Sequence, residues 1–349
     1  MRIFLVVASC LLSVLIGLTL SHRDSPASLS APNRKPVIGL SLDTLKEERW
    51  QTDRNLFENR VKALGAETLI QSANGDDTRQ IADVQALISR HIDVLVIVPH
   101  NGEAMAKAVA LAHEAGIPVL SYDRLITGCD LDLYITFDNV KVGELQAQYL
   151  VDHVTTRPLR LIRIYGSKTD NNALLFKQGQ DNVLQPLIQK GDIQVVHEDW
   201  AQDWRPENAK KITNAAITKV GDKIDAILAS NDGTAGGAIQ ALIEEGVSGK
   251  ITVTGQDAEL PACQRIVNGQ QAMTIYKPIA KLANQAAETA VKLAKHKPVI
   301  APASVHNGHS PIPSILLDVT VVTKENMAET VIKDGFHPQE KVYQGAAGR

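Results

Sequence analysis

The sequence predicts an α/β protein made of two lobes, each built on a doubly wound parallel sheet. Short apolar runs alternate with amphipathic helical segments at a spacing of roughly 30 residues, which is typical of βαβ units. With 349 residues, the chain has room for two domains that each bury a sizeable core. Polar residues follow almost every apolar run, and in open parallel sheets ligands bind beyond the carboxyl ends of the strands.

The predicted strands fall into two series. Those of the first half are 37–42, 67–73, 94–99 and 117–123, and those of the second half are 159–166, 193–200, 224–232, 251–257 and 272–277. Between them, apolar residues recur at helical spacing, as at Phe57, Val61 and Leu64. Gly65 and Gly116 follow two of these segments and would end the helices as C-caps.

The N-terminus differs from the rest of the chain. A basic start precedes an uncharged run from Ile3 to Leu20, which predicts an export signal or an N-terminal anchor over residues 1–23. The run is close to the length of a spanning helix and no clean cleavage motif follows it, so cleavage and retention both stay open. The residues before Cys10 loosely resemble a lipoprotein box, which leaves lipidation open as well. Residues 24–35 are rich in Ser, Pro and Ala and are expected to be a tether.

Composition and missing motifs exclude several classes of protein. The net charge of −3 offers no basic surface for nucleic acid. The sequence has no dinucleotide, P-loop, nucleophile-elbow or zinc-protease motif, so we expect no enzyme, no cofactor and no metal. His306 and His309 are expected to be solvated loop residues, and Cys129 and Cys263 buried small apolar residues.

What remains is a set of polar and aromatic side chains at the predicted strand ends. It comprises Arg49, Trp50, Asp123, Arg124, Asp138, Asn139, Asp170, Asn171, Asn172, Trp204, Asn231, Asp232, Gln256, Asp257 and Lys277. Sugar hydroxyls donate and accept hydrogen bonds at once, so they suit such a mixture of acceptors and cationic donors. An indole can stack on the C–H face of a sugar ring. The alternative is that single Asp and Asn residues here are only helix caps and turn formers.

At these residues the chain resembles the type I periplasmic sugar-binding proteins of bacterial ABC importers. The likeness runs from about Pro36 to His337 and is carried by the stretches "ERWQTDR", "DVLVIVPHNG", "YDR", "FDNVKVGELQA", "DNNALLF", "SNDGTAGGAIQAL", "GQDAEL" and "YKPIAKLAN". It implies two lobes joined by three hinge crossings. It also implies a monosaccharide ligand, D-xylose or a close relative, delivered to an ABC transporter permease by a monomeric protein of the periplasm.

The resemblance also implies which residues hold the sugar and how the chain divides. The implied ligand-binding residues are Arg49, Trp50, Asp123, Arg124, Asn172, Trp204, Asn231, Asp257 and Lys277. The implied N-terminal lobe is 36–139 with 277–309, and the C-terminal lobe is 140–276 with 310–340. The chain would therefore return to the second lobe near Ser310. His100, in "PHNG", is a variation close to the implied cleft.

Two other functions fit parts of the pattern. A sensor of the same fold would hand the sugar signal to a chemoreceptor or a membrane kinase, and the sequence does not separate it from a transport protein. A sugar-responsive transcription factor would need a helix-turn-helix before the lobes, where this chain has its apolar run.

Overall fold

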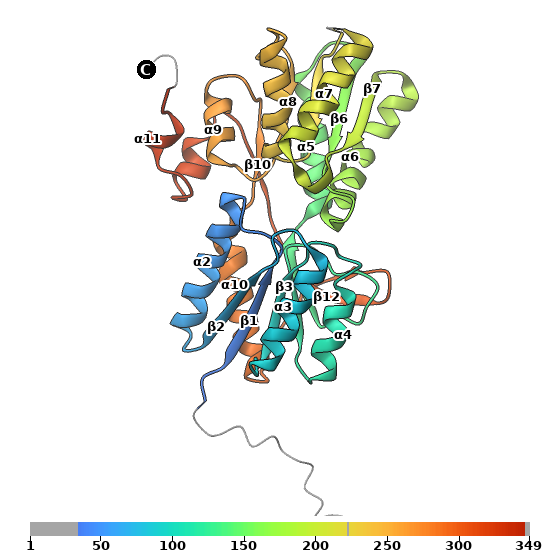
Figure 1. Cartoon of the computed structure of the whole chain (residues 1–349). Helices are drawn as coiled ribbons and strands as arrows, with labels where there is room; N and C mark the ends of the chain where they lie inside the picture. Colours follow the sequence, from blue (N-terminus) through green and yellow to red (C-terminus); the bar gives the residue numbers. More distant parts are fainter. Residues whose placement is uncertain (1–33, 222, 346–349) are drawn as a thin grey trace, which may run out of the picture. The chain divides into compact units, whose positions relative to one another are not determined.

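Two main sheets, one in each lobe, organise the chain from Pro36 onward, as Figure 1 shows. The computed structural model describes residues 34–221 and 223–345. The signal or anchor expected over residues 1–23, Cys10 within it, and most of the tether expected over 24–35 therefore lie outside the described residues.

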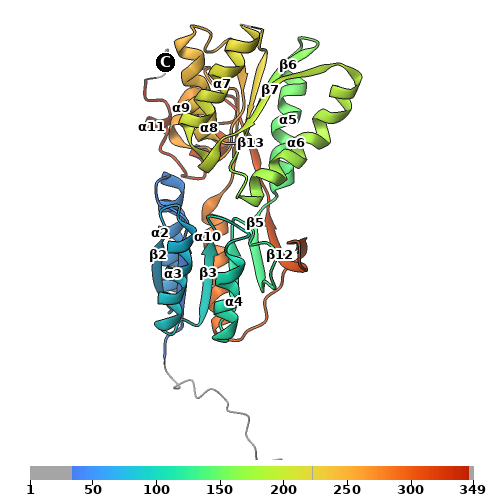
Figure 2. The same cartoon turned by 45° about the vertical axis from the view of Figure 1, so that its right-hand side comes forward.

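The first lobe contains a seven-stranded sheet in the order β11-β12-β5-β4-β3-β1-β2. Its neighbouring strands are parallel except for the antiparallel pair of β11 and β12. The strands are β1 (Val37–Leu42), β2 (Glu67–Ser72), β3 (Val94–Val98), β4 (Val119–Tyr122), β5 (Leu133–Phe137), β11 (Ala303–His306) and β12 (Pro311–Leu317). In Figure 2, β12 lies beside β5, in agreement with the register of this pair.

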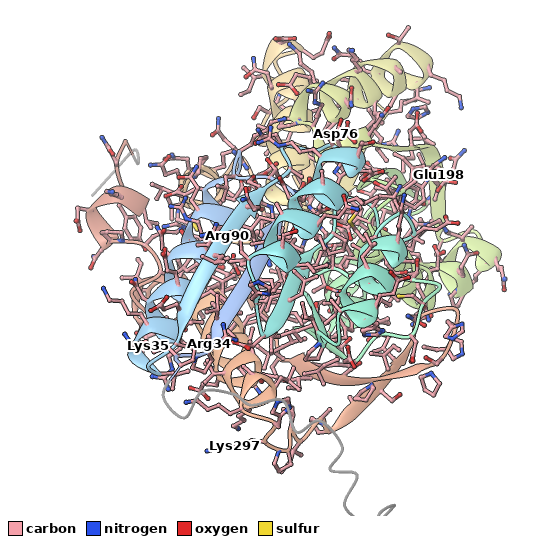
Figure 3. The ribbon with its side chains drawn as sticks, turned by 60° about the horizontal axis from the view of Figure 1, so that its bottom comes forward. Arg34, Lys35, Asp76, Arg90, Glu198 and Lys297 are labelled. Atoms are coloured by element: carbon pink, nitrogen blue, oxygen red, sulfur yellow. The ribbon has the colours of Figure 1, made fainter. Side chains whose placement is uncertain are left out.

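Helices cover both faces of this sheet. One apolar core joins the sheet to α2 (Glu48–Ala63) and α10 (Ile279–Ala294), and another joins it to α3 (Asp77–Ser89) and α4 (Ala106–Glu114). Every residue of β3 is buried, because its side chains alternate between the two cores. Asp76, labelled in Figure 3, caps α3 by accepting a hydrogen bond from the Arg79 N–H at 2.7 Å.

The second lobe contains a four-stranded parallel sheet in the order β7-β6-β8-β9. Its strands are β6 (Leu159–Tyr165), β7 (Ile193–Trp200), β8 (Ala226–Ala229) and β9 (Thr252–Val253). The helices α5 (Asn139–His153) and α6 (Asn171–Lys190) cover one face, and α7 (Pro206–Val220) and α8 (Asp232–Glu244) cover the other. Each face of the sheet has its own apolar core, as a doubly wound sheet requires.

Smaller elements complete the second lobe. They are the 3₁₀ turn η1 (Gln202–Trp204), α9 (Leu260–Val267), β10 (Thr274–Tyr276), β13 (Thr320–Val322), the π-helical turn η2 (Ala328–Ile332) and α11 (Gln339–Val342). The strand expected at 272–277 was predicted to extend a parallel sheet. The structure instead pairs β10 with β13 in a separate antiparallel ribbon.

The chain crosses between the lobes three times: from β5 to α5, from β10 to α10, and from β12 to β13. The return to the second lobe expected near Ser310 is wrong, because β11 and β12 belong to the sheet of the first lobe. β12 pairs with β5 from Ser314 to Leu317, so the third crossing follows Leu317. Pro311 and Pro313 interrupt the apolar pattern of β12, and both precede the part that pairs with β5.

Two glycines let α5 and α6 approach each other closely. A Cβ added at Gly143 in α5 would overlap the carbonyl oxygen of Phe176, and one added at Gly179 in α6 would overlap that of Val140. The two helices therefore touch backbone to backbone. This contact fixes the start of α6, from which Asn172 extends toward the other lobe.

Gly143→Ala should destabilise the sugar-free protein by about 1–3 kcal/mol, because the added methyl group forces the two backbones apart. Urea unfolding followed by circular dichroism measures this loss. Gly233→Ala in α8 is the matched control, since its nearest neighbours would lie at 3.6–3.8 Å, an ordinary contact. That change should be neutral or stabilising through helix propensity. Equal stability of Gly143→Ala and wild type would contradict the close contact.

Candidate functional site

The strand ends of both lobes meet at a cavity of about 280 Å³. The nine residues predicted to bind the ligand all line it: Arg49, Trp50, Asp123, Arg124, Asn172, Trp204, Asn231, Asp257 and Lys277. Nine further residues complete the lining: Glu47, Glu48, Asp170, Phe176, Pro206, Gly233, Gln256, Glu259 and Pro261. The structure thus brings together every member of the predicted set and adds carboxylates and one amide to it.

Arg49, in the first turn of α2, is the centre of the charged network. Its guanidinium pairs with Asp123 in the same lobe and with Asp257 of the second lobe at 3.2 Å. It also lies 3.5 Å from Asp53, one turn along α2. Burial opposes the charge, but these three carboxylates outweigh it and raise the pKa of Arg49 well above its ordinary range.

Asp257 receives a second cation from the crossing between β10 and α10. The Lys277 ammonium, with a side chain only 2% exposed, lies 2.8 Å from Asp257 Oδ1. One carboxylate of the second lobe is therefore held by Arg49 of the first lobe and by Lys277 of the hinge. Such shared, charge-assisted contacts join the two lobes at the wall of the cavity.

Arg124 makes the second ionic bridge between the lobes. Its guanidinium donates to Asp43 of the first lobe at 2.7 Å and lies 3.0 Å from Asp170 of the second. The same Asp170 oxygen accepts a hydrogen bond from the Trp204 indole N–H at 3.1 Å. The other Asp170 oxygen accepts from the Asn172 N–H at 2.9 Å and so caps α6. Asp170 is thus a helix cap, as the alternative interpretation expected, and its second oxygen also contacts Arg124 and Trp204 at the cavity.

Asn172 and Asn231 also line the cavity while their side chains make hydrogen bonds within the protein. The Asn172 amide donates to Asp123 Oδ1 across the lobes at 3.2 Å. Asn231 Oδ1 accepts from the Thr234 N–H at 2.9 Å in a capping box at the start of α8. Since that oxygen is occupied, the Asn231 amide N–H groups are the atoms it can offer to a ligand. Asp138 only caps α5 and does not line the cavity.

The two tryptophans lie in different surroundings. The Trp204 indole rests on the backbone of Gly166, where any Cβ would overlap the ring, and it meets the Phe176 ring edge-on at 6.2 Å. Trp50 is 4% exposed, and the guanidinium groups of Arg49 and Arg124 lie over its ring at 4.5 and 5.2 Å. Trp50 thus supports the two arginines through cation–π contacts.

Three of the nine predicted residues have a left-handed backbone. The φ angles are 61° at Asp123, 57° at Trp204 and 99° at Asp257. Residues other than glycine adopt this region at a cost, and such residues cluster at ligand sites where the surrounding structure holds them. The backbone at these three residues is therefore held in an unfavourable conformation, which sets the direction of their side chains.

Further carboxyl groups lie around Asp257. Asp232 is fully buried and accepts hydrogen bonds from Gln271 and Thr274 at 2.8 and 2.9 Å. Burial, with a smaller contribution from Asp257, raises the pKa of Asp232 to about 7. Burial and the charges of Asp232 and Asp257 raise the pKa of Glu259 to about 8. Protons held by these carboxyls near neutral pH reduce the negative charge around Asp257.

A second cavity of about 690 Å³ shares Arg124, Asp170 and Trp204 with the first. His100 lines this second cavity, and its Nδ1 lies 3.0 Å from Asp43 Oδ1. The hydrogen bond to Asp43 raises the pKa of His100 above 6.5, although partial burial opposes the shift. His100 therefore shares Asp43 with Arg124, which lines both cavities.

The other predictions about single residues have these outcomes. His306 and His309 are both exposed, but only His309 lies in the loop between β11 and β12, because His306 is the last residue of β11 and pairs with Pro311. Cys263 is buried and Cys129 is partly buried, and both are free thiols. Within the described ranges, no helix is long and apolar enough to cross a membrane, and no group of three or more His, Cys, Asp or Glu side chains could hold a metal ion.

Two α/β lobes, three crossings and a charged cavity at the strand ends define a two-lobed binding protein. Residues 38–298 match the family model described as periplasmic binding protein domain, and the chain belongs to this family. The fold class and the resemblance inferred from the sequence are thereby confirmed. Membership of this family implies a location outside the cytoplasm.

The chain is similar to other proteins over almost its whole length. It is 50% identical over 327 residues to a D-xylose-binding periplasmic protein of Haemophilus influenzae, covering 93% of this chain and 98% of that protein. It is 47% identical over 327 residues to a D-xylose-binding periplasmic protein of Escherichia coli, covering 94% and 98%. A carbohydrate transporter solute-binding protein of Chloroflexus aurantiacus, solved with D-glucose, superposes with a TM-score of 0.83 at 32% identity, covering 88% of this chain and 98% of that one.

The contact between His100 and Asp43 predicts a dependence of stability on pH. Because the pKa of His100 is raised in the folded protein, its protonated form stabilises the fold below 6.5, and this contribution is lost as the pH rises through the raised pKa. Urea unfolding at pH 5.5 and pH 9 should show wild type to be more stable than His100→Gln by a margin that shrinks with increasing pH. When wild type and His100→Gln both also carry Asp43→Asn, the difference in stability between the two proteins should no longer depend on pH. A margin that grows with pH would refute this assignment.

Proposed function

We propose that this protein captures one molecule of D-xylose in the cavity between its lobes and delivers it to the permease of an ABC transporter. The observation that carries the proposal is the convergence of Arg49, Asp123, Asp257 and Lys277, with the Trp204 indole, on one cavity of about 280 Å³. The two D-xylose-binding relatives support the choice of sugar. We further propose a monomer that an N-terminal signal exports to the periplasm.

The chemistry of the cavity suits a small neutral polyol. Ionised donors and acceptors alternate around it, so each sugar hydroxyl can donate to a carboxylate and accept from a guanidinium or ammonium. The volume falls near the lower end of small-molecule sites, which span roughly 300–1,000 Å³. These features favour a monosaccharide over a longer saccharide.

Closure of the lobes is the proposed route from binding to delivery. Arg49 with Asp257, Arg124 with Asp170, and Asn172 with Asp123 are pairs that join the two lobes around the cavity. A sugar that bonds to members of these pairs binds the closed arrangement better than the open one and so shifts the population toward it. The closed lobes then present one composite surface to the permease.

Isothermal titration calorimetry tests the sugar assignment. D-Xylose should bind with one-to-one stoichiometry and more tightly than arabinose, ribose, galactose or glucose. The pentose epimers misplace a hydroxyl against a fixed ionic partner, and the hexoses add a hydroxymethyl group to a small cavity. If any other sugar of this panel bound more tightly than D-xylose, the assignment of xylose as the ligand would be wrong.

Asp257→Ala should weaken xylose binding at least about tenfold, since a hydrogen bond to a charged group contributes roughly 1.5–3 kcal/mol. Small-angle scattering checks the closure separately. Saturating xylose should shrink the radius of gyration of wild type, and the variant should need more sugar for the same contraction. Glu288→Ala removes an ion-pair carboxylate on α10 away from the cavity and should match wild type. Binding without contraction would rule out closure and leave the sugar assignment standing.

A further inference from the structure

Gln256 carries an acceptor that the protein itself leaves unpaired. Its side chain is 2% exposed and lines the cavity in the loop after β9. The amide nitrogen donates to the Ser230 carbonyl at 3.2 Å, whereas Oε1 is buried and has no hydrogen-bond partner. Buried polar atoms without a partner are rare in folded proteins, and each calls for an explanation.

The orientation of this amide follows from its one partner. A carbonyl oxygen can only accept a hydrogen bond, so the atom of Gln256 that faces Ser230 must be the N–H group. Oε1 is therefore the atom on the other side of the amide. The neighbouring backbone is already tied, because the Gln256 carbonyl accepts from the Asp232 N–H at 2.9 Å. The side chain has little freedom to find another donor.

Asp257 and Asp170, two other acceptors that line the cavity, differ from Gln256 in having cationic partners. Asp257 is paired with Arg49 and Lys277, and Asp170 with Arg124. Each of these carboxylates stays satisfied in the absence of a ligand. Gln256 Oε1 is a neutral acceptor with no protein donor, so it is free to accept a hydrogen bond from a ligand in the cavity.

We propose that Gln256 Oε1 accepts a hydrogen bond from one hydroxyl of the bound sugar and that Gln256 thereby determines specificity. This inference rests on the proposed function and adds a residue to it. A site built to hydrogen-bond a hydroxyl rejects an analogue that lacks it, because the buried acceptor then stays unpaired. Gln256 therefore requires a hydroxyl at one position of the ring.

Gln256→Met tests the proposal, because methionine nearly matches glutamine in length and removes the acceptor. It also removes the N–H that donates to the Ser230 carbonyl, but that carbonyl still accepts from the Gln146 side chain at 3.2 Å. Xylose should bind about tenfold more weakly to the variant by calorimetry. The melting temperature of the sugar-free variant should not fall by a comparable amount, since the lost oxygen is unpaired in wild type and the Ser230 carbonyl keeps its hydrogen bond from Gln146. An unchanged affinity would overturn the proposal.

Monodeoxy analogues of D-xylose, each lacking one hydroxyl, identify the contact. One analogue should lose affinity for wild type but bind Gln256→Met as well as xylose does. The same result with Gln256→Ala keeps the test valid if the methionine variant does not fold. If every analogue loses the same factor in wild type and in the variant, Gln256 contacts no hydroxyl and the proposal fails.

Thr68→Val is the matched control, since it removes another buried unpaired oxygen, that of Thr68 in β2, which does not line the cavity. It should leave xylose affinity unchanged, and an equal loss in this control would overturn the specific role of Gln256. Absence of xylose binding by wild type would instead refute the proposed function. The two failures are therefore distinguishable.

Discussion

Compensation of buried charge is the constraint on which the site depends. Arg49 is one-tenth exposed and has carboxylates of both lobes as partners, and Lys277 is almost fully buried against Asp257. Charges taken out of water cost several kcal/mol each unless partners compensate them. Because part of that compensation comes from the opposite lobe, the cavity is electrostatically complete only when the lobes are together. The wall of the cavity and the contact between the lobes thus rest on the same ion pairs.

The same side chains serve the fold and the site, which explains why the cavity lies at the strand ends. Asp170 caps α6 with one oxygen and holds Arg124 and Trp204 with the other. Asn231 caps α8 and keeps its amide N–H groups for the cavity. In a parallel sheet the helix that follows each strand begins at the carboxyl edge, so a capping residue already stands where a ligand binds.

The sequence predicted the repeating pattern and the polar edge well, because both depend on local order. The strands expected at 37–42 and 193–200 match β1 and β7 residue for residue. β12 was not predicted because Pro311 and Pro313 interrupt its apolar pattern, and the third crossing, which follows β12, was therefore misplaced. Asp53 was missed because it lies inside α2 rather than at a strand end, although its spacing from Arg49 is that of a helical ion pair. Gln256 stood among the strand-end residues, but its unpaired oxygen becomes visible only when its neighbours are known.

Charged and neutral groups contribute differently to recognition in such a cavity. Asp257 and Arg124 each keep an ionic partner when a ligand hydroxyl is missing, so the loss of one hydroxyl costs them little beyond the lost contact. A buried acceptor without an internal partner has no such alternative, and a ligand that fails to satisfy it leaves the full cost of desolvation in place. For the proposed sugar ligand we therefore expect affinity to come chiefly from the ionic network, and discrimination between sugars to depend on the few polar atoms that the network leaves unpaired.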